Sequence, residues 1–304
     1  MNKLKHILSA DQFTDFAYLQ KLFAAAQKFE KENGKLYDIL RGKVVACIFY
    51  EPSTRTRLSF ESAVLRLGGR VISAESGKDN LSVVKGESFD DTVRIISQYV
   101  DALVLRHSEG GAADAAAKVS EVPVINAGDG GNEHPTQALL DVYTIWKEKG
   151  TLENLHVAFG FDPKHSRTIR SLALILSHFK GNRFTFISPK NLRAAPEIIE
   201  KIKINGAAVE EITELEPGLE ADIFYANRLQ GERFADQGEF EKHRRDLIIT
   251  ADKVKGKKVL LMDPLPRIDE IDVAVDKLPN AIYFRQAKNG MYVRMALLQD
   301  VLGD

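Results

Sequence analysis

The chain alternates short apolar runs with longer amphipathic segments from about residue 44 onward. The short runs are rich in β-branched and aromatic residues, which is typical of strands buried in a sheet. They predict strands at 44–50, 70–73, 102–105, 122–125, 155–159, 184–188, 208–211, 222–225 and 258–262. Apolar residues at helical spacing predict helices between them, among them 89–99, 134–149, 167–178 and 195–204. This alternation predicts parallel sheets covered by helices, and therefore an α/β fold.

So many strands are unusual for one sheet in a chain of 304 residues. We therefore expect two α/β domains, each a mainly parallel sheet flanked by helices, with the active site in the cleft between them. The glycine-rich segment "NAGDGGNEHPTQ" is the favoured break, which gives domains at 1–133 and 134–285. A strongly apolar helical pattern from Met291 to Val301 predicts that 286–304 forms a C-terminal helix packing back on the domains.

The amino-acid composition restricts the kinds of molecule that the protein is expected to bind. The formal net charge is -1, so the charge balance gives no support to a nucleic-acid or membrane partner. No segment approaches the roughly 20 apolar residues of a membrane span, and the first 31 residues lack the apolar core of a signal peptide. Cys47 is the only cysteine. The sequence thus predicts no disulfide framework and no cysteine-based metal site, and a cytoplasmic location is expected.

A polar cluster lies where the first strand passes into a helix, in "EPSTRTRLSFESAVLRLGG" from Glu51 to Gly69. Residues 53–57 carry three hydroxyls and two guanidinium groups. Free N–H groups and the positive end of the dipole point outward at a helix start, so the cluster predicts an anion site, such as one for phosphate. The alternative is that Ser53 or Thr54 only caps the helix. One cap needs one hydroxyl, however, and two arginines at a helix start oppose the dipole unless a ligand offsets their charge.

Polar motifs follow five further predicted strands as well. The full set is "STRTR", "RHSEGG", "NAGDGGNEHPTQ", "FDPKHSRT", "NRLQGER" and "DPLPR". In open parallel sheets, ligands bind beyond the carboxyl ends of the strands. The repeated coincidence predicts one functional cleft built from both domains.

Several of these motifs together resemble the carbamoyltransferase family. They are "FYEPSTRTRLSFE", "KGES", "LRHSEGGAA", "NAGDGGNEHPTQALLD", "SRT", "RLQGERF" and "DPLPRIDEI", in the family's order from about residue 44 to the C-terminus. The combination of "STRTR" with "HPTQ" is specific to this family. Arg228 and Gln230 indicate its aspartate branch, and Pro264 stands where the ornithine branch has a cysteine.

The resemblance implies that carbamoyl phosphate and L-aspartate react to give N-carbamoyl-L-aspartate and phosphate, an early step of pyrimidine biosynthesis. The first domain would bind carbamoyl phosphate and the second aspartate, without cofactor or metal. The family's active unit is a homotrimer with shared active sites, and the resemblance allows separate regulatory chains as further partners. Lys85 would lie on a mobile loop that reaches the neighbouring chain's site and contacts phosphate and aspartate. A Lys-Gly-Glu sequence before a helix is otherwise more often a solvated turn.

The same resemblance assigns residues to carbamoyl phosphate. Those expected near its phosphate, carbonyl and amide groups are Ser53, Thr54, Arg55, Thr56, Lys85, Arg106, His134 and Gln137. His134 would polarise the carbonyl together with Thr56, as a neutral imidazole that donates one N–H. Arg106 would touch phosphate and carbonyl, and the backbone carbonyls of Pro264 and Leu265 would hold the NH2 group. The catalytic set is Arg55, Thr56, Lys85, Arg106 and His134. In isolation, His134 would more often be a surface or capping histidine.

Arg167 and Arg228 would clamp the two carboxylates of aspartate, with Gln230 as a further donor and Lys85 from the neighbouring chain. A lone arginine at a helix start is more often a surface residue, but two at strand ends in one half favour a carboxylate site. Glu51 resembles a family glutamate that pairs with Arg167 and Arg233 as the domains close; otherwise it is an exposed turn residue.

The chain departs from the family pattern at four positions. Leu81 replaces a loop serine, Phe161 a glycine, Asn227 a threonine or serine, and Asp263 a histidine. These changes bear on phosphate affinity and amino-acid specificity. The alternatives are a carbamoyltransferase for another acidic amino acid, and a weakly active homologue that binds carbamoyl phosphate. A dinucleotide oxidoreductase is disfavoured because no G-x-G-x-x-G opens a helix after a strand.

Overall fold

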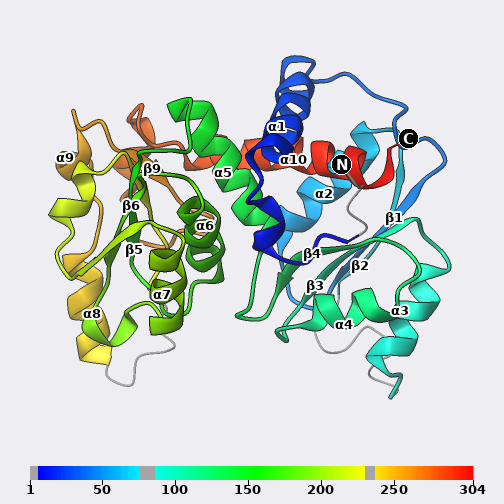
Figure 1. The fold of residues 1–304 in the computed structure, drawn as a ribbon, viewed down its shortest axis with the longest axis horizontal. Coiled ribbons are helices and arrows are strands. Elements are labelled where there is room, and N and C mark those ends of the chain that lie inside the picture. The colour runs from blue at the N-terminus through cyan, green and yellow to red at the C-terminus, as the bar shows by residue number, and fades with distance from the viewer. Residues whose placement is uncertain (1–5, 76–85, 230–236, 304) are drawn as a thin grey trace. The chain divides into compact units, whose positions relative to one another are not determined.

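The computed structural model describes residues 6–75, 86–229 and 237–303. The chain divides into two compact units. The first comprises Met1–Tyr143 with Lys288–Asp304, and the second comprises Thr144–Ala287. Each unit contains one parallel sheet with helices on its faces, which confirms the predicted α/β class (Figure 1).

The sheet of the first unit has the strand order β2-β1-β3-β4. Its strands are β1 (Val44–Phe49), β2 (Arg70–Glu75), β3 (Ala102–His107) and β4 (Val124–Asp129). The helices that belong wholly to this unit are η1 (Ala10–Phe13), α1 (Phe16–Lys31), α2 (Thr54–Arg66), α3 (Phe89–Ser97) and α4 (Ala112–Val119). Helices α3 and α4 cover one face of the sheet, and α2 lies on the other (Figure 1).

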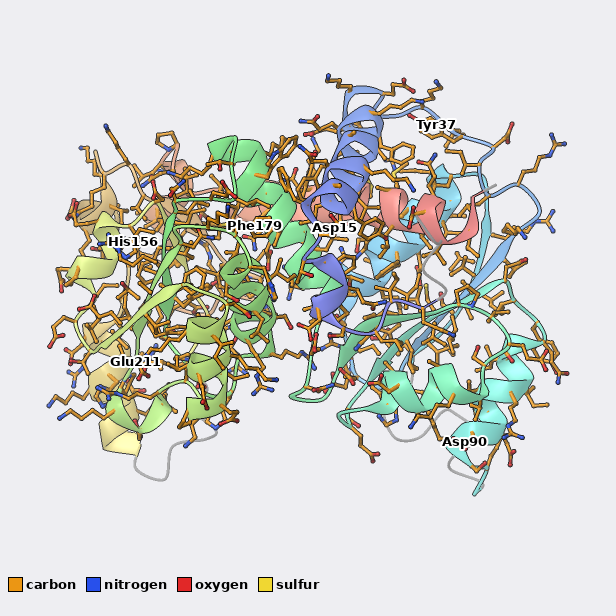
Figure 2. The ribbon with its side chains drawn as sticks, viewed as in Figure 1. Asp15, Tyr37, Asp90, His156, Phe179 and Glu211 are labelled. Atoms are coloured by element: carbon orange, nitrogen blue, oxygen red, sulfur yellow. The ribbon has the colours of Figure 1, made fainter. Side chains whose placement is uncertain are left out.

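The core of the first unit follows from the alternation of side chains along its strands. Ala46 and Ile48 of β1, with Leu103 and Leu105 of β3, face the same side of the sheet, because residues two apart share a face. They pack against Val93, Val100, Ala116 and Val124. Helix α1 begins at a cap in which Asp15, labelled in Figure 2, accepts a hydrogen bond from the Ala17 N–H at 2.9 Å.

The sheet of the second unit has the order β7-β6-β5-β8-β9. Its strands are β5 (His156–Gly160), β6 (Arg183–Ile187), β7 (Ala208–Ile212), β8 (Ile223–Tyr225) and β9 (Leu260–Met262). Its helices are α6 (Arg167–Ser177), η3 (Lys190–Leu192), α7 (Pro196–Ile204), η4 (Glu216–Glu220), α8 (Gln237–Asp246), α9 (Ala251–Val254) and η6 (Val273–Lys277). Helices α6 and α7 lie on one side of the sheet, and α8 and α9 lie on the other (Figure 1).

Two helices contribute residues to both units: α5 (Pro135–Lys149) and α10 (Tyr283–Leu302). The units divide between Tyr143 and Thr144, which differs from the expected division between 133 and 134. Helix α5 continues through the division without a break, and its buried residues Ala138, Leu139, Leu140 and Val142 remain with the first unit.

Helix α10 begins at Tyr283, slightly ahead of the predicted start at residue 286, and its residues from Lys288 onward belong to the first unit. Within the described ranges, no helix has the length and apolar character needed to cross a bilayer.

Candidate active site

The turn after β1 carries several hydroxyl-bearing residues at the start of α2. Ser53 is the N-cap residue of α2, but its side chain makes no capping hydrogen bond. Thr54 and Arg55 are exposed on the first turn, and Thr56 is buried. A role limited to capping therefore does not describe Ser53. The structure instead presents hydroxyl and guanidinium groups at the positive end of a helix, which is an arrangement suited to an anion.

Arg57 differs from Arg55 in its surroundings. Its guanidinium forms ion pairs with Glu61 of α2, at 3.4 Å, and with Glu75 at the end of β2. Arg57 thus joins the helix to the neighbouring strand and supports the turn. Arg55 is the arginine of this motif that is exposed to solvent.

Arg106 lies beside this turn because β3 pairs with β1, in a register that sets Arg106 opposite Phe49. Its guanidinium donates to the Ala127 carbonyl at 3.3 Å and pairs with Glu51 at 3.1 Å. Glu51 therefore contacts an arginine of its own unit. The predicted pairing of Glu51 with Arg167 and Arg233 concerns closing of the domains, and Arg233 lies outside the described residues.

The loop that follows β4 is organised by a buried carboxylate, Asp129, which is 1% exposed. It accepts hydrogen bonds from the Gly111 N–H at 2.8 Å, the Asn126 amide at 3.0 Å, and the Asn132 amide and Glu133 N–H at 3.2 Å each. These bonds bring the motif after β3 and the motif after β4 together at one sheet edge.

Gly130 allows this close approach. Its φ is +50°, and a Cβ atom there would lie 2.6 Å from the Gly110 nitrogen and 2.8 Å from the Ser108 oxygen. Glu133, two residues before α5, accepts from the Ser9 hydroxyl at 2.9 Å and from the Ala10 N–H at 2.6 Å. Burial raises the pKa of Glu133, although these hydrogen bonds partly oppose the effect. The N-terminal segment is thereby fixed next to His134.

His134 precedes α5 and is 4% exposed. Its carbonyl accepts the N–H groups of Gln137 and Ala138, at 3.0 and 3.1 Å, which places His134 at the cap of the helix. The Gln137 amide donates to Asp141 at 2.9 Å, one turn further along α5. The first unit therefore brings Ser53, Thr54, Arg55, Thr56, Arg106, His134 and Gln137 to elements that follow neighbouring strands.

Arg294 of α10 lies outside all of the sequence motifs that predict the site. It is buried, and its guanidinium lies over the Phe60 ring of α2. Burial lowers its pKa to about 10, and Asp141 opposes this shift electrostatically. A charged residue inside a strongly apolar helical pattern is the sequence signal that could have identified it.

In the second unit, the motifs that follow β5, β8 and β9 also lie close together, because these three strands are neighbours in the sheet. Arg167 is the first residue of α6, and Ser166 caps that helix by accepting the Ile169 N–H at 3.2 Å. The Asn227 amide donates to Ser166 at 2.8 Å and to Thr168 at 3.2 Å. The segment before Arg228 is thus tied to the residues on both sides of Arg167.

The departures at Phe161 and Asp263 are buried. The Phe161 ring lies 5.6 Å from that of Phe224, and its N–H donates to the Asn227 carbonyl at 3.1 Å. Asp263 follows β9 and accepts the Leu265 N–H at 2.5 Å, which fixes the backbone at Pro264 and Leu265. Leu81, Lys85 and Gln230 lie outside the described residues.

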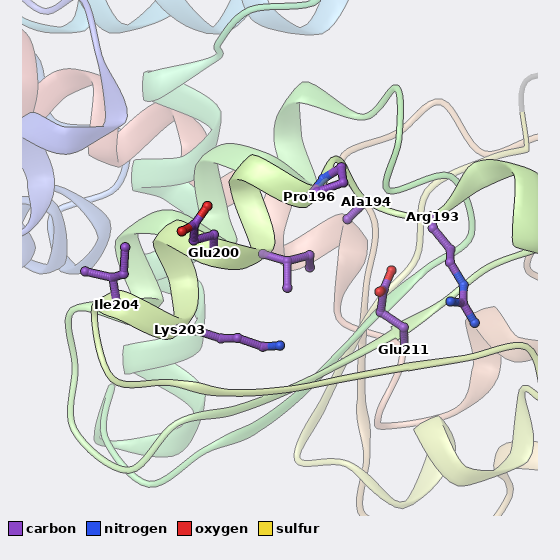
Figure 3. Close-up of a pocket in the computed structure, with 8 residues that line it drawn as sticks. Arg193, Ala194, Pro196, Glu200, Lys203, Ile204 and Glu211 are labelled. Carbon is purple, nitrogen blue, oxygen red and sulfur yellow. The ribbon is translucent and has the colours of Figure 1, made fainter.

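A groove of about 680 Å³ lies between α7 and β7 (Figure 3). It is lined by Arg193, Ala194, Pro196, Ile199, Glu200, Lys203, Ile204 and Glu211. Lys203 extends into it from the helix and Glu211 from the strand. None of the predicted site residues lines this groove, so it forms no part of the candidate site. In the described part of the chain, no cluster of three or more histidine, cysteine or acidic side chains is arranged to hold a metal ion.

The chain belongs to the aspartate/ornithine carbamoyltransferase family. The family's carbamoyl-P binding domain matches residues 5–147, and its Asp/Orn binding domain matches residues 153–301. Among individual proteins, the aspartate carbamoyltransferase catalytic subunit of Methanocaldococcus jannaschii is 46% identical, over 99% of both chains. That of Clostridium perfringens is 46% identical over the full length of both.

Solved structures agree with this assignment. The catalytic subunit of M. jannaschii aspartate transcarbamoylase superposes with a TM-score of 0.93 at 45% identity, covering 98% of both chains. Aspartate transcarbamoylase from Trypanosoma cruzi, in complex with carbamoyl phosphate and aspartate, has a TM-score of 0.91 at 34% identity. The match covers 98% of this chain and 96% of that one.

Proposed function

We propose that the protein transfers the carbamoyl group of carbamoyl phosphate to the amine of L-aspartate, giving N-carbamoyl-L-aspartate and phosphate in pyrimidine biosynthesis. The observation that carries the proposal is the arrangement of the first unit, where the hydroxyl-rich start of α2 follows the strand next to the one that carries Arg106. The relatives named above support it, since one of them binds both substrates.

In this proposal, the start of α2 binds the phosphate group. Ser53, Thr54 and Thr56 donate hydroxyl hydrogen bonds, and Arg55, which is exposed on the first turn, supplies a positive charge. Arg57 instead pairs with Glu61 and Glu75. Arg106 reaches phosphate and carbonyl from β3. Neutralising the phosphate makes it a better leaving group, because negative charge accumulates on it as the carbon–oxygen bond breaks.

His134 and Thr56 polarise the carbonyl. The aspartate amine bonds to the carbonyl carbon, loses a proton, and displaces phosphate. Gln137 is proposed to contact the carbamoyl NH2 group, an orientation supported by its hydrogen bond to the buried Asp141. The carbonyls of Pro264 and Leu265 are proposed to hold the same NH2 group and the incoming amine.

Arg167 and Arg228, with Gln230, are proposed to bind the two aspartate carboxylates. Two arginines at fixed separation suit a dicarboxylate, since each guanidinium presents a planar fork of donors. The hydrogen bonds from Asn227 to Ser166 and Thr168 support this role, because they join the segments that carry the two arginines.

The proposal extends to assembly and location. We infer a homotrimer in which Lys85 enters the neighbouring chain's site, without cofactor or metal in the chemistry. Separate regulatory chains are compatible partners. A cytoplasmic location is supported by the single, buried cysteine, which needs no oxidising compartment.

The deciding experiment is a carbamoylation assay with purified protein, carbamoyl phosphate and a panel of amino acids that includes L-aspartate, L-glutamate and L-ornithine. We expect carbamoyl-aspartate as the main product, at a kcat/KM far above that for any other acceptor. A higher kcat/KM with another acidic amino acid would establish the alternative specificity. Tight binding of carbamoyl phosphate without turnover on any acceptor would instead identify a binding homologue.

A further inference from the structure

Two buried carboxyl groups face each other in the second unit. Asp263, directly after β9, is 2% exposed, and Glu270 is 5% exposed. The Glu270 carboxyl lies within hydrogen-bond reach of the Asp263 carboxyl. An ionised carboxylate only accepts hydrogen bonds, so two ionised groups repel each other at this separation, whereas one shared proton joins them.

The oxygen atoms of Glu270 show where such a proton belongs. Oε2 accepts the N–H groups of Ile268 and Asp269, at 2.8 and 3.0 Å. Oε1 is buried, and no N–H or O–H group among the described residues donates to it. A proton between the two carboxyl groups gives Oε1 its hydrogen bond. Burial raises the pKa of Glu270, while the backbone N–H groups, the charge of Arg228 and the hydrogen bond with the Asp263 side chain partly oppose that rise.

We propose that Asp263 and Glu270 share one proton, and that this pair is a positioning device for Arg228 and for the Pro264–Leu265 backbone. The inference rests on the proposed function, in which Arg228 binds an aspartate carboxylate. Neither carboxyl group acts on the substrate directly. The pair sets the charge beside Arg228 and the position of the loop after β9.

Arg228 acts electrostatically on Glu270, and with one shared proton the pair presents a single negative charge to it. Loss of the proton adds a second charge, which competes with the substrate carboxylate for Arg228. The neighbouring Asp269 is engaged by Arg244 of α8, so Asp263 and Arg228 are the charged side chains acting on Glu270 in the described part of the chain.

The second effect is mechanical. Asp263 holds the Leu265 N–H at 2.5 Å, and its own N–H donates to Gln286 at 2.9 Å. Repulsion between two ionised carboxylates displaces the Asp263 side chain and, with it, the backbone of Leu265. Binding of the amino-acid substrate should therefore weaken as pH rises through the titration of the pair, with the KM for aspartate changing more than kcat.

The test compares KM and kcat for aspartate across pH in the wild type, Asp263→Asn and Glu270→Gln. Either amide donates permanently and removes the titration. The ratio of the wild-type KM to the variant KM should rise about tenfold as pH increases through the titration of the pair. Taking this ratio removes ionisation of the substrate amine, which is common to all the enzymes. Asp269→Asn, which removes a neighbouring charge, should keep the wild-type profile.

A measurement without turnover separates this inference from the proposed reaction. Carbon-13 NMR of the wild type labelled at Asp and Glu carboxyl carbons should show two coupled resonances that titrate together above the ordinary range of carboxyl groups and disappear in Asp263→Asn. If both groups titrate at ordinary values, or if all variants share one KM profile, the pair is refuted. Absence of activity on aspartate despite the coupled titration would refute the proposed function and leave the shared proton standing.

Discussion

The guanidinium carbon of Arg294 lies 5.0 Å from the centre of the Phe60 ring, in a fully buried position. This contact joins α10 to α2, the helix whose first turn carries the proposed phosphate-binding residues. Asp141 supplies the opposing charge from α5, where it also accepts a hydrogen bond from Gln137. Three helices of the first unit thus meet around one buried arginine.

Replacing Arg294 with Met should destabilise the protein strongly. The change leaves Asp141 as a buried charge without its guanidinium, which typically costs about 3–5 kcal/mol. Urea denaturation measures the loss. The double variant Asp141→Asn, Arg294→Met should lose less than the sum of the two single variants, since removing both charges leaves neither uncompensated. Strict additivity would mean that the two groups do not interact.

Arg55 and Arg57 form a matched pair for testing the phosphate site. Arg55→Ala should lower kcat/KM for carbamoyl phosphate by about 1.5–3 kcal/mol, the contribution typical of a hydrogen bond to a charged group. Arg57→Ala should instead lower stability by roughly 0.2–1 kcal/mol, as expected for partly exposed ion pairs, with a smaller kinetic effect. Near-normal turnover in a folded Arg55→Ala variant would remove this residue from the site.

His134→Ala should lower turnover more than it weakens carbamoyl phosphate binding. Its imidazole is proposed to act on the carbonyl oxygen as negative charge grows there, and one such donor is worth about 2.7–4 kcal/mol in the transition state. Binding is measured by calorimetry and turnover at saturating substrate. The opposite pattern, weaker binding with an unchanged saturated rate, would assign His134 to ground-state binding.

The raised pKa of Glu133 predicts a pH-dependent stability. The folded state holds the proton on Glu133 at pH values where the unfolded chain has released it, so this residue's contribution falls as pH rises above the ordinary value of 4.5. Glu133→Gln removes that titration. The free energy of unfolding of the wild type, minus that of the variant, should therefore decrease between about pH 4 and about pH 7. The exposed Glu121→Gln serves as control and should give a much smaller change.

The shared-site proposal predicts recovery of activity on mixing. Lys85→Ala and Arg55→Ala should each be inactive. In mixed trimers, some sites combine an intact Arg55 from one chain with an intact Lys85 from the next. Each variant, dissociated and reassembled alone, is the control. No recovery in trimers proven to be mixed by mass spectrometry would place Lys85 in its own chain's site or outside the site.

The sequence located each strand that the structure describes, because apolar β-branched runs form the buried central strands β1, β3, β5 and β6. The edge strands β2 and β7 are largely exposed or half-buried. The predicted end of a strand is wrong where polar residues continue the strand. Strand β4 continues through Asn126 to Asp129, beyond the predicted end at 125. Asn126 and Asp129 read as turn residues, yet they are buried and bonded to each other at 3.0 Å. A local pattern cannot show that Leu8 also accepts from the Asn126 amide, since that partner is distant in sequence.

The residues of the candidate site also fall into two groups, those that the sequence could identify and those that only the structure reveals. Motif residues at strand ends, such as Arg106 and Arg167, could be selected from local sequence and family resemblance. Supporting residues could not, because their roles depend on contacts distant in sequence, as with Glu133 and Ser9 or Arg294 and Phe60. The exchange at Asn227 was visible in the sequence, but its bonds to Ser166 and Thr168 required the structure.

The division of α10 bears on how the chain folds as it is made. Synthesis proceeds from the N-terminus, so residues 144–287 leave the ribosome before 288–304, which the first unit needs. Leu297, Leu298 and Val301 are buried. The first unit is therefore the first to be translated in large part, but its fold can be completed only after residues 288–304 have been made. Until translation reaches this helix, the nascent first unit exposes the apolar surface that α10 covers in the folded protein.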